Sequence, residues 1–294
     1  MIFLRNSPKN STLMPEVVSG IIGLLVFVLV LTDFSCREKQ QHIAYGNNPV
    51  AGKYQQVNGL KMYYEIYGTG APLVLIHGNG ASIISMHEQI SYFSKNYQVI
   101  AVDSRSHGKT VDDGDSLSYD QMATDLNVLL DSLHIDSTYI IGHSDGGIVG
   151  LIMAYRYPSK VKKLVAMSPN IRPDSAVLYP KDETQSKIDF TKYEDSVKAG
   201  FTSAKHTFKL LKLMNDYPHI SAEELASIKA PVLIMTSDHD VILLSHIIEI
   251  FKAIPGAELS VLPGSTHNAH RKNATVFNET VNHFFQKNIS KESH

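Results

Sequence analysis

The chain has 294 residues, of which 43% are hydrophobic, and its formal net charge is -2 with a sequence pI of about 6.7. This length and composition predict one large globular domain, and the near-neutral charge excludes the sustained positive field that a nucleic-acid-binding protein requires. Cys36 is the one cysteine, which excludes an intramolecular disulfide, a zinc finger and a CxxC redox site. We expect no metal and no cofactor.

The first 36 residues predict a signal or anchor segment. Arg5 and Lys9 precede an apolar stretch, residues 17–31. A membrane-spanning helix usually needs about 20 apolar residues, whereas a signal-peptide core needs roughly 7 to 15, so the stretch favours an export signal. A single uncleaved N-terminal transmembrane anchor is the alternative, although Asp33 makes a longer span costly. A start at Met14 would remove Arg5 and Lys9.

The segment LTDFSC, which ends at Cys36, resembles the lipobox of bacterial lipoproteins. In that family a small residue, here Ser35, precedes a cysteine that is lipidated and becomes the new N-terminus. Asp33 and Phe34 stand where leucine and a small residue are usual. The resemblance implies an exported lipoprotein held at the membrane of the bacterial cell envelope through Cys36.

A tether and a hairpin are expected next. Residues 37–49 are polar and have no periodic pattern, which is typical of a flexible connection. The folded domain is then expected to span residues 50–294. Its first two strands are predicted at 50–57 and 60–67, joined by Asn58-Gly59, a dipeptide that suits a type I′ hairpin turn. This hairpin would form an antiparallel edge of the sheet.

After the hairpin, short apolar runs alternate with glycine-bearing turns and helix-length segments. This alternation predicts an α/β fold, with a mostly parallel central sheet of about eight strands and helices on both faces. One helix is expected over residues 118–134, with Ser118 as its N-cap. Six runs are apolar enough to be central strands buried on both faces, namely 73–76, 98–102, 138–141, 162–167, 232–236 and 259–262.

The loop after the run at 73–76 reads HGNG, from His77 to Gly80. Here the sequence resembles the α/β-hydrolase family, whose members carry His-Gly at this point. The resemblance implies that the backbone N–H of Asn79 forms one half of an oxyanion hole. It also implies that His77 is a structural residue and not the catalytic base.

A second loop, VDSRSHGKT at residues 102–110, resembles the D-x-R-G-x-G-x-S segment of the same family. Ser106 replaces the usual glycine and Thr110 the usual serine. We expect Asp103 and Arg105 to be a charged pair that ties loops together near the active-site end of the sheet. Asp103 is not expected to be the catalytic acid.

The strongest local signal is GHSDGG at residues 142–147, between a predicted strand and a helix-like stretch. It contains the G-x-S-x-G nucleophile elbow, which predicts Ser144 as a nucleophile on a sharp strand-to-helix turn. Gly142 and Gly146 remove side chains that would collide there. The helix N-terminus directs N–H groups toward a developing oxyanion, and the family resemblance assigns the N–H of Asp145 to that role beside Asn79. The alternative is a glycine-rich turn with a capping serine.

Residues 170–228 interrupt the alternation. They are helix-like and rich in lysine, and they contain no convincing strand. A structureless loop of that length is uncommon in a compact domain, so we expect a helical cap insertion packed over the edge of the sheet. The residues of this cap do not identify a substrate.

The segment APVLIMTSDHD at residues 230–240 resembles the family's P-x-L-x-x-x-G-x-x-D strand. Its spacing from Pro231 implies Asp240 as the catalytic acid, although Ser237 stands where glycine is typical. Asp238 is the rival acid. The Asp-His-Asp cluster is disfavoured as a metal site because no third ligand is clearly placed.

The histidine of the triad is expected in VLPGSTHNAH, residues 261–270, which resembles the family's closing Pro-Gly and histidine segment. His267 occupies the matching place, with Thr266 in place of the usual glycine. His270 is the second choice. Ser144, Asp240 and His267 follow the chain order of α/β-hydrolase triads, nucleophile first and histidine last.

The resemblance covers residues from about 53 to 287 and implies a serine hydrolase that cleaves a small-molecule carboxylic ester or related acyl bond through an acyl-enzyme. Family members that use aspartate as nucleophile are disfavoured by Ser144. Carbon–carbon bond hydrolysis and other acyl transfer on the same triad remain alternatives, as does a non-catalytic ligand-binding homologue.

Overall fold

A computed structural model describes residues 44–174 and 176–287 of the chain. The predicted signal segment, with Cys36, lies outside these residues, as do residues 37–43 of the predicted tether. Within the described ranges, no helix combines the length and the apolar character needed to cross a membrane.

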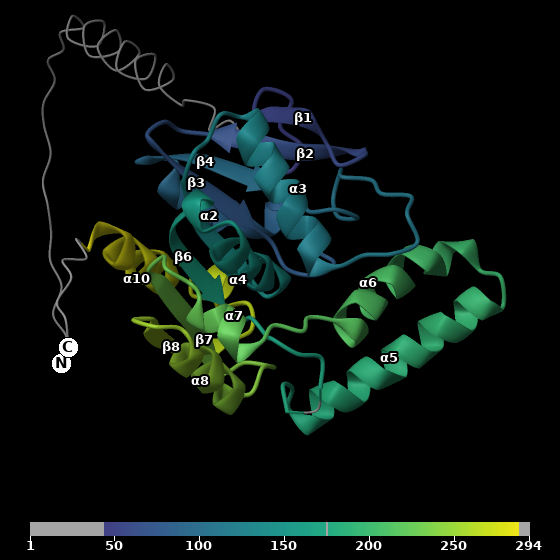
Figure 1. The fold of residues 1–294 in the computed structure, drawn as a ribbon. Coiled ribbons are helices and arrows are strands. Elements are labelled where there is room, and N and C mark those ends of the chain that lie inside the picture. The colour runs from purple at the N-terminus through teal and green to yellow at the C-terminus, as the bar shows by residue number, and fades with distance from the viewer. Residues whose placement is uncertain (1–43, 175, 288–294) are drawn as a thin grey trace, which may run out of the picture. The chain divides into compact units, whose positions relative to one another are not determined.

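Eight strands form one sheet in the order β1-β2-β4-β3-β5-β6-β7-β8 (Figure 1). Only the pairings of β1 with β2 and of β2 with β4 are antiparallel, and the other five are parallel. The predicted fold class is confirmed. The strands are β1 (Gly52–Val57), β2 (Leu60–Tyr67), β3 (Ala71–Ile76), β4 (Tyr97–Val102), β5 (Thr138–His143), β6 (Val161–Met167), β7 (Val232–His239) and β8 (Glu258–Thr266).

The turn between β1 and β2 has the predicted hairpin geometry. Asn58 has φ 39° and Gly59 has φ 85°, and a type I′ turn requires positive φ at both central residues. Val57 pairs with Leu60 across the turn in an antiparallel register. The antiparallel edge expected from the sequence is therefore confirmed.

Helices cover both faces of the sheet. Alternate residues of β3 enter different clusters, because successive side chains of a strand point to opposite faces: Val74 packs in one apolar cluster and Leu75 in the other. Helices α3, α4 and α8 contribute to the first cluster, and α2, α9 and α10 to the second. The helices of the sheet layers are α2 (His87–Phe93), α3 (Tyr119–Ser132), α4 (Asp145–Arg156), α8 (Leu244–Ala253), α9 (Ala269–Lys272) and α10 (Ala274–Gln286), with short 3-10 turns η1 (Ile83–Met86) and η2 (Pro158–Lys160).

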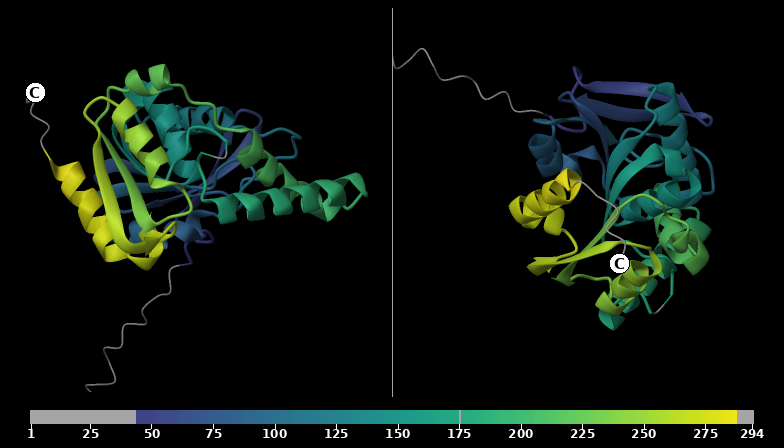
Figure 2. Two further views of the ribbon diagram at one scale, coloured as in Figure 1. Left: turned by 90° about the horizontal axis from the view of Figure 1, so that it is seen from below. Right: turned by 60° about the vertical axis from the view of Figure 1, so that its left-hand side comes forward.

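The segment between β6 and β7 is helical, as expected for a cap. It contains α5 (Pro180–Lys198), η3 (Thr202–Ala204), α6 (Lys205–Asp216) and α7 (Ala222–Ala226). Helices α5 and α6 form a hairpin that projects beyond the sheet layers in Figures 1 and 2. The α6 helix buries Leu210 and Leu213 in the first apolar cluster.

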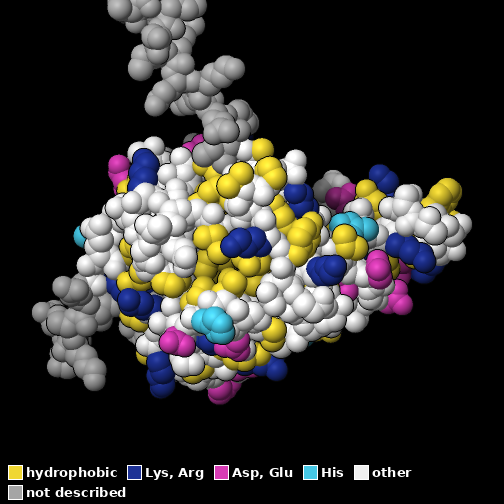
Figure 3. Space-filling view, turned by 90° about the horizontal axis from the view of Figure 1, so that it is seen from above, with side chains coloured by type: hydrophobic (Ala, Val, Ile, Leu, Met, Phe, Trp, Pro, Cys, Tyr) yellow, Lys and Arg dark blue, Asp and Glu magenta, His cyan; other side chains and the backbone are white. Residues whose placement is uncertain are grey.

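Helix α5 differs from α6 because none of its described side chains is buried. Phe190 of α5 contacts Phe208 of α6, with ring centroids 5.4 Å apart. Charged side chains of both signs are spread over the projecting hairpin (Figure 3). Of the two helices in the hairpin, α6 thus supplies the side chains that are buried against the sheet layers.

The prediction that the run at 259–262 is a central strand buried on both faces is wrong. Strand β8 is the last strand of the sheet and pairs only with β7. Val261 is 38% exposed, whereas Leu262 is buried in the second cluster. A run with three apolar residues in four fits an edge strand as well as a central one, because a strand's place in the sheet depends on its neighbours and not on its own composition.

Candidate active site

Ser144 lies at the turn from β5 to α4 in a strained backbone conformation, with φ 53° and ψ -116°. The flanking glycines are sterically required. A Cβ at Gly142 would lie 2.0 Å from the carbonyl oxygen of Gly146, and a Cβ at Gly146 would lie 2.2 Å from that of Ile76. This is the geometry expected of a nucleophile elbow, in which the serine is presented at the carboxyl end of the strand.

The HGNG loop lies directly against this turn. A Cβ placed on Gly78 would be 3.1 Å from the Cβ of Ser144. Among the described residues, the backbone N–H groups of Asn79 and Asp145 donate no hydrogen bond. Two unpaired N–H donors therefore come from the two loops that meet at Ser144, one of them at the N-terminus of α4, where the helix dipole favours negative charge.

His267 follows β8 and meets Asp240, which follows β7. The imidazole Nδ1 donates to Asp240 Oδ1 at 2.7 Å. His267 and Ser144 line the same cavity, whose volume is about 500 Å³. The described hydrogen bonds join His267 to Asp240 but not to the hydroxyl of Ser144, and such contacts in unliganded hydrolytic sites often tighten only when substrate binds.

Asp240 is buried and fully hydrogen-bonded. Its Oδ1 also accepts from the backbone N–H of Ile242 at 3.1 Å, and its Oδ2 accepts from the hydroxyls of Ser168 and Thr236. Burial by itself raises the pKa of Asp240, but the hydrogen bonds and charge of His267, together with the Ser168 hydroxyl, outweigh it and hold the pKa below its ordinary value. The carboxyl is thus an anion at neutral pH.

The rival acid and base have other partners. Asp238 is exposed and accepts from the backbone N–H groups of Gly264 and Ser265 at 2.8 and 3.0 Å, so it fixes the loop that leads to His267. His270 is buried, with its ring centroid 3.9 Å from that of His143, and burial lowers the pKa of His270 to about 3. Neither residue lines the cavity that contains Ser144.

His77 is enclosed by its own loop. Its Nδ1 donates to the carbonyl oxygen of Gly78 at 2.8 Å, and its Nε2 accepts from the backbone N–H of Ser104 at 3.1 Å. Burial lowers the pKa of His77 to about 4. Both ring nitrogens are therefore engaged in holding two loops together, as a structural histidine would be.

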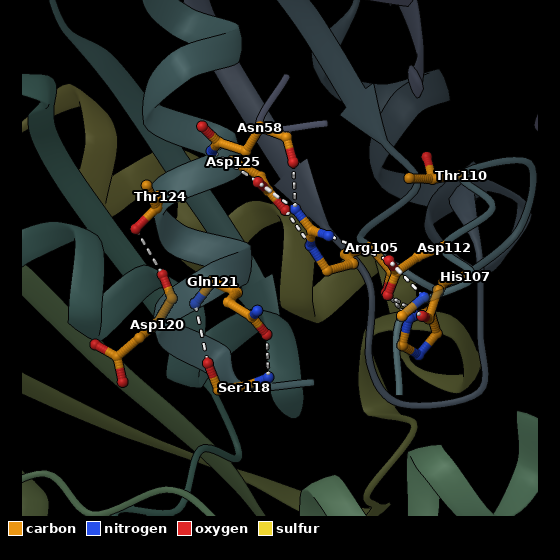
Figure 4. Close-up of polar contacts among 12 residues, drawn as sticks. Asn58, Arg105, His107, Thr110, Asp112, Ser118, Asp120, Gln121, Thr124 and Asp125 are labelled. Carbon is orange, nitrogen blue, oxygen red and sulfur yellow. Dashed lines mark hydrogen bonds and ion pairs between the residues drawn. The ribbon is translucent and has the colours of Figure 1, made fainter. Parts of the chain in front are cut away.

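Asp103 and Arg105 do not pair with each other, which corrects the expected charged pair. Asp103 accepts from the backbone N–H groups of Ile83 and Lys109. Arg105 instead forms a bidentate pair with Asp125 of α3, at 2.7 and 2.9 Å, and also contacts Asp112 (Figure 4). The sequence motif indicated two charges that tie loops together, and each of them does so with a partner other than the one expected, both within its own loop and 20 residues away.

Asp112 extends this network to the cap. Lys209 of α6 donates to Asp112 Oδ2 at 2.6 Å and to the carbonyl oxygen of Gly114 at 2.6 Å. His206 Nε2 donates to the carbonyl oxygen of Ser106 at 2.8 Å. The loop after β4 therefore carries the polar attachment of α6.

The carboxyl of Asp145 is a feature that the sequence analysis missed. Asn79 Nδ2 donates to Asp145 Oδ2 at 2.9 Å, and the Tyr119 hydroxyl also bonds this carboxyl. Burial raises the pKa of Asp145 to about 6 against these two hydrogen bonds. Because the carboxyl lines the same cavity as Ser144, the elbow motif DGG could have indicated it as a group at the site.

The cavity is lined on one side by loops of the sheet layers and on the other by the cap. Met214 and Asn215 of α6 face it, as does Arg172, which is held by a bidentate pair with Glu249. Across the described ranges, no group of three or more His, Cys, Asp or Glu side chains is arranged to hold a metal ion. The apolar and aromatic residues that line the cavity are Tyr119, Pro173, Val177, Leu178, Met214, Val241 and Ile242.

Comparisons with known proteins agree with the fold. A family model described as alpha/beta hydrolase fold matches residues 71–219. A putative carbamate hydrolase, RutD of Azorhizobium caulinodans, is 24% identical and covers 75% of this chain and 93% of its own length. The human serine hydrolase BPHL is 26% identical, over 83% of this chain and 89% of its own length. The crystal structure of an enol-lactonase from Burkholderia xenovorans LB400 has a TM-score of 0.66 at 21% identity, covering 80% of this chain and 100% of that one.

Proposed function

Because this chain belongs to the alpha/beta hydrolase fold family, we propose that it is a serine hydrolase that cleaves a small-molecule carboxylic ester through Ser144, His267 and Asp240. The observation that carries the proposal is the 2.7 Å hydrogen bond between His267 and a buried, anionic Asp240, beside a serine on a strained elbow in the same cavity. A cavity of about 500 Å³ is of the size that small ligands occupy.

The direction of the Asp240 hydrogen bond sets the tautomer of His267. Since Oδ1 accepts from Nδ1–H, the neutral ring has its lone pair at Nε2. Nε2 then takes the proton from the Ser144 hydroxyl while Oγ attacks the acyl carbon. Asp240 stabilises the imidazolium that forms, and it keeps its own negative charge.

The tetrahedral intermediate places a negative oxygen in reach of the N–H groups of Asn79 and Asp145, which act as the oxyanion hole. Collapse of the intermediate expels the alcohol, which takes its proton from His267 Nε2–H. Water then attacks the acyl-enzyme with His267 again as base, which releases the acid and restores the Ser144 hydroxyl.

Acyl chemistry is favoured by the relatives. The names of two of them specify a carbamate and an enol-lactone as substrates, and both of these compounds react by attack at a carbonyl carbon. The chain is a hydrolase of this fold, and its serine, histidine and oxyanion donors are the groups that cleavage of a carboxylic ester requires.

The test is reaction of the full-length chain with a fluorophosphonate–rhodamine probe and with p-nitrophenyl esters of increasing acyl length. The wild-type chain should be labelled at Ser144 and should release p-nitrophenol. Ser144→Ala should abolish labelling and lower turnover by up to about a million-fold. An unlabelled wild-type chain would favour a ligand-binding homologue, and labelling without ester hydrolysis would favour carbon–carbon bond cleavage.

The location of the enzyme is a separate proposal. The N-terminal pattern supports export and attachment to the membrane through a lipidated Cys36, followed by the tether predicted at 37–49 and a domain whose cap spans about 170–228. The tether is shorter than predicted, because the backbone N–H groups of Gly46 and Asn48 donate to the Glu65 carboxylate and so belong to the folded domain. Mass spectrometry of the native protein should find a mature N-terminus at Cys36 that carries lipid. An intact N-terminus without lipid would contradict the lipoprotein and favour the uncleaved anchor.

A further inference from the structure

The acid of the proposed triad is held on its far side by a serine from a neighbouring strand. Ser168 directly follows β6, and its hydroxyl donates to Asp240 Oδ2, the oxygen that does not face His267. Ser168 is 1% exposed, so water does not compete for this contact. The second donor to Oδ2 is the Thr236 hydroxyl, at 3.2 Å.

The backbone of Ser168 is in the left-handed region, with φ 53°. Its N–H donates to the carbonyl oxygen of Met235 in β7 at 2.8 Å, which ties the turn after β6 to the neighbouring strand. Glycine adopts this conformation without steric cost, whereas a residue with a Cβ does not. A serine at this position therefore bears backbone strain, and its hydroxyl supplies a contact with Asp240 that a glycine would lack.

The two oxygens of Asp240 have a clear division of contacts. Oδ1 accepts from His267 and from the backbone N–H of Ile242, and Oδ2 accepts from the two hydroxyls. Rotation of the carboxylate would break both sets at once. Without Ser168, Oδ2 would keep only the longer bond from Thr236 in a buried site, where an under-bonded charged oxygen is unfavourable.

We propose that Ser168 is a positioning residue of the hydrolytic site, whose hydroxyl fixes the plane of the Asp240 carboxylate so that Oδ1 faces His267. The inference rests on the proposed serine-hydrolase function. Ser168 does not line the cavity with Ser144, so its effect on substrate would pass through Asp240 and His267. Its loss should lower kcat and leave KM nearly unchanged.

Loss of the hydroxyl should also move the pH profile. A carboxylate that loses a hydrogen-bond donor is more basic, so Asp240 would hold the imidazolium form of the ring beside it more strongly. The acid limb of kcat/KM, which reports the free enzyme's base, should shift to higher pH. The other titratable groups near His267 are Asp145, His143 and His270, and they are the same in the wild-type chain and in the variant.

The experiment compares Ser168→Ala and Ser168→Gly with the wild-type full-length chain. The glycine variant relieves the backbone strain while removing the hydroxyl, so it should fold even if the alanine variant does not. The quantities to measure are the rate of fluorophosphonate labelling at Ser144 from pH 5 to 9 and the kcat and KM for p-nitrophenyl acetate. Both rates should fall about tenfold or more, with KM within about twofold and the acid limb moved upward.

Thr236→Val is the matched control, because it removes the longer of the two hydroxyl bonds to the same oxygen and should have the smaller effect. A Ser168→Gly chain that folds, labels within about twofold of the wild-type rate and keeps its acid limb would overturn the inference alone. A wild-type chain that does not react with the probe would overturn the proposed function and this inference with it.

Discussion

The loops at the carboxyl ends of the strands and the α5–α6 hairpin are fixed in different ways. In the loops, Asp240 is buried and bonded at both oxygens, and Ser144 is held in a strained turn by flanking glycines. In the hairpin, α5 has no buried side chain among those described, and α6 is attached by Leu210, Leu213 and a few polar contacts. The groups proposed for chemistry are firmly held by burial and hydrogen bonds, while part of the cavity wall lies on the less buried hairpin.

Removing the negative charge of Asp240 should give the largest effect on kcat. It tests whether the loops at the carboxyl ends of the strands act together. Asp240→Asn keeps the shape but favours the wrong tautomer of His267, so kcat should fall by about 10⁴-fold, as in serine hydrolases generally. Asp238→Asn is the matched control two residues away and should retain most activity, because Asp238 contacts only backbone N–H groups. Equal losses in the two variants would contradict the assignment. The measurement is kcat for p-nitrophenyl acetate.

The difference between the two cap helices can be tested by stability. Leu213 of α6 is 1% exposed, so Leu213→Ala should lower the free energy of unfolding by about 2–5 kcal/mol. Ile188 of α5 is 56% exposed, and Ile188→Ala should change it by less than about 0.5 kcal/mol. Urea denaturation measures both. Similar losses would mean that α5 is anchored as firmly as α6.

The smallest expected effect concerns the buried carboxyl of Asp145 beside Ser144. Its folded-state pKa is raised from 3.8 to about 6, so the native chain keeps a proton that the unfolded chain has released. The contribution of this group to stability is therefore present below about pH 4 and is lost as pH rises to about 6. Asp145→Asn cannot titrate, and its stability relative to wild type should increase between these pH values. Urea denaturation at both ends of the range measures the difference in unfolding free energy between the variant and the wild-type chain. A difference that does not change with pH would contradict the raised pKa.

The fold and the elbow could be predicted from sequence because their causes are local. Strand periodicity and the Asn58-Gly59 turn depend on neighbouring residues, and Gly142 and Gly146 are required by one tight turn. The loops that carry Asp240 and His267 were found through family motifs at strand ends.

What could not be predicted depends on the order of strands and loops in space. Ser168 reaches Asp240 because β6 and β7 are neighbours in the sheet, and strand order is not encoded in any single strand. Arg105 pairs with Asp125 and Asp112, which lie 20 and 7 residues away along the chain. Nothing in the local sequence distinguishes these two aspartates from other acidic residues. The edge position of β8 was missed for the same reason.

That edge position has a consequence for how activity would be lost. His267 is attached to β8, which has a neighbouring strand on one side only, whereas Ser144 follows β5 in the middle of the sheet. Fraying of an edge strand needs fewer broken hydrogen bonds than global unfolding. Amide hydrogens of β8 should therefore exchange with solvent sooner than those of β5, and mild heating should separate the base from the nucleophile reversibly while the rest of the sheet stays folded.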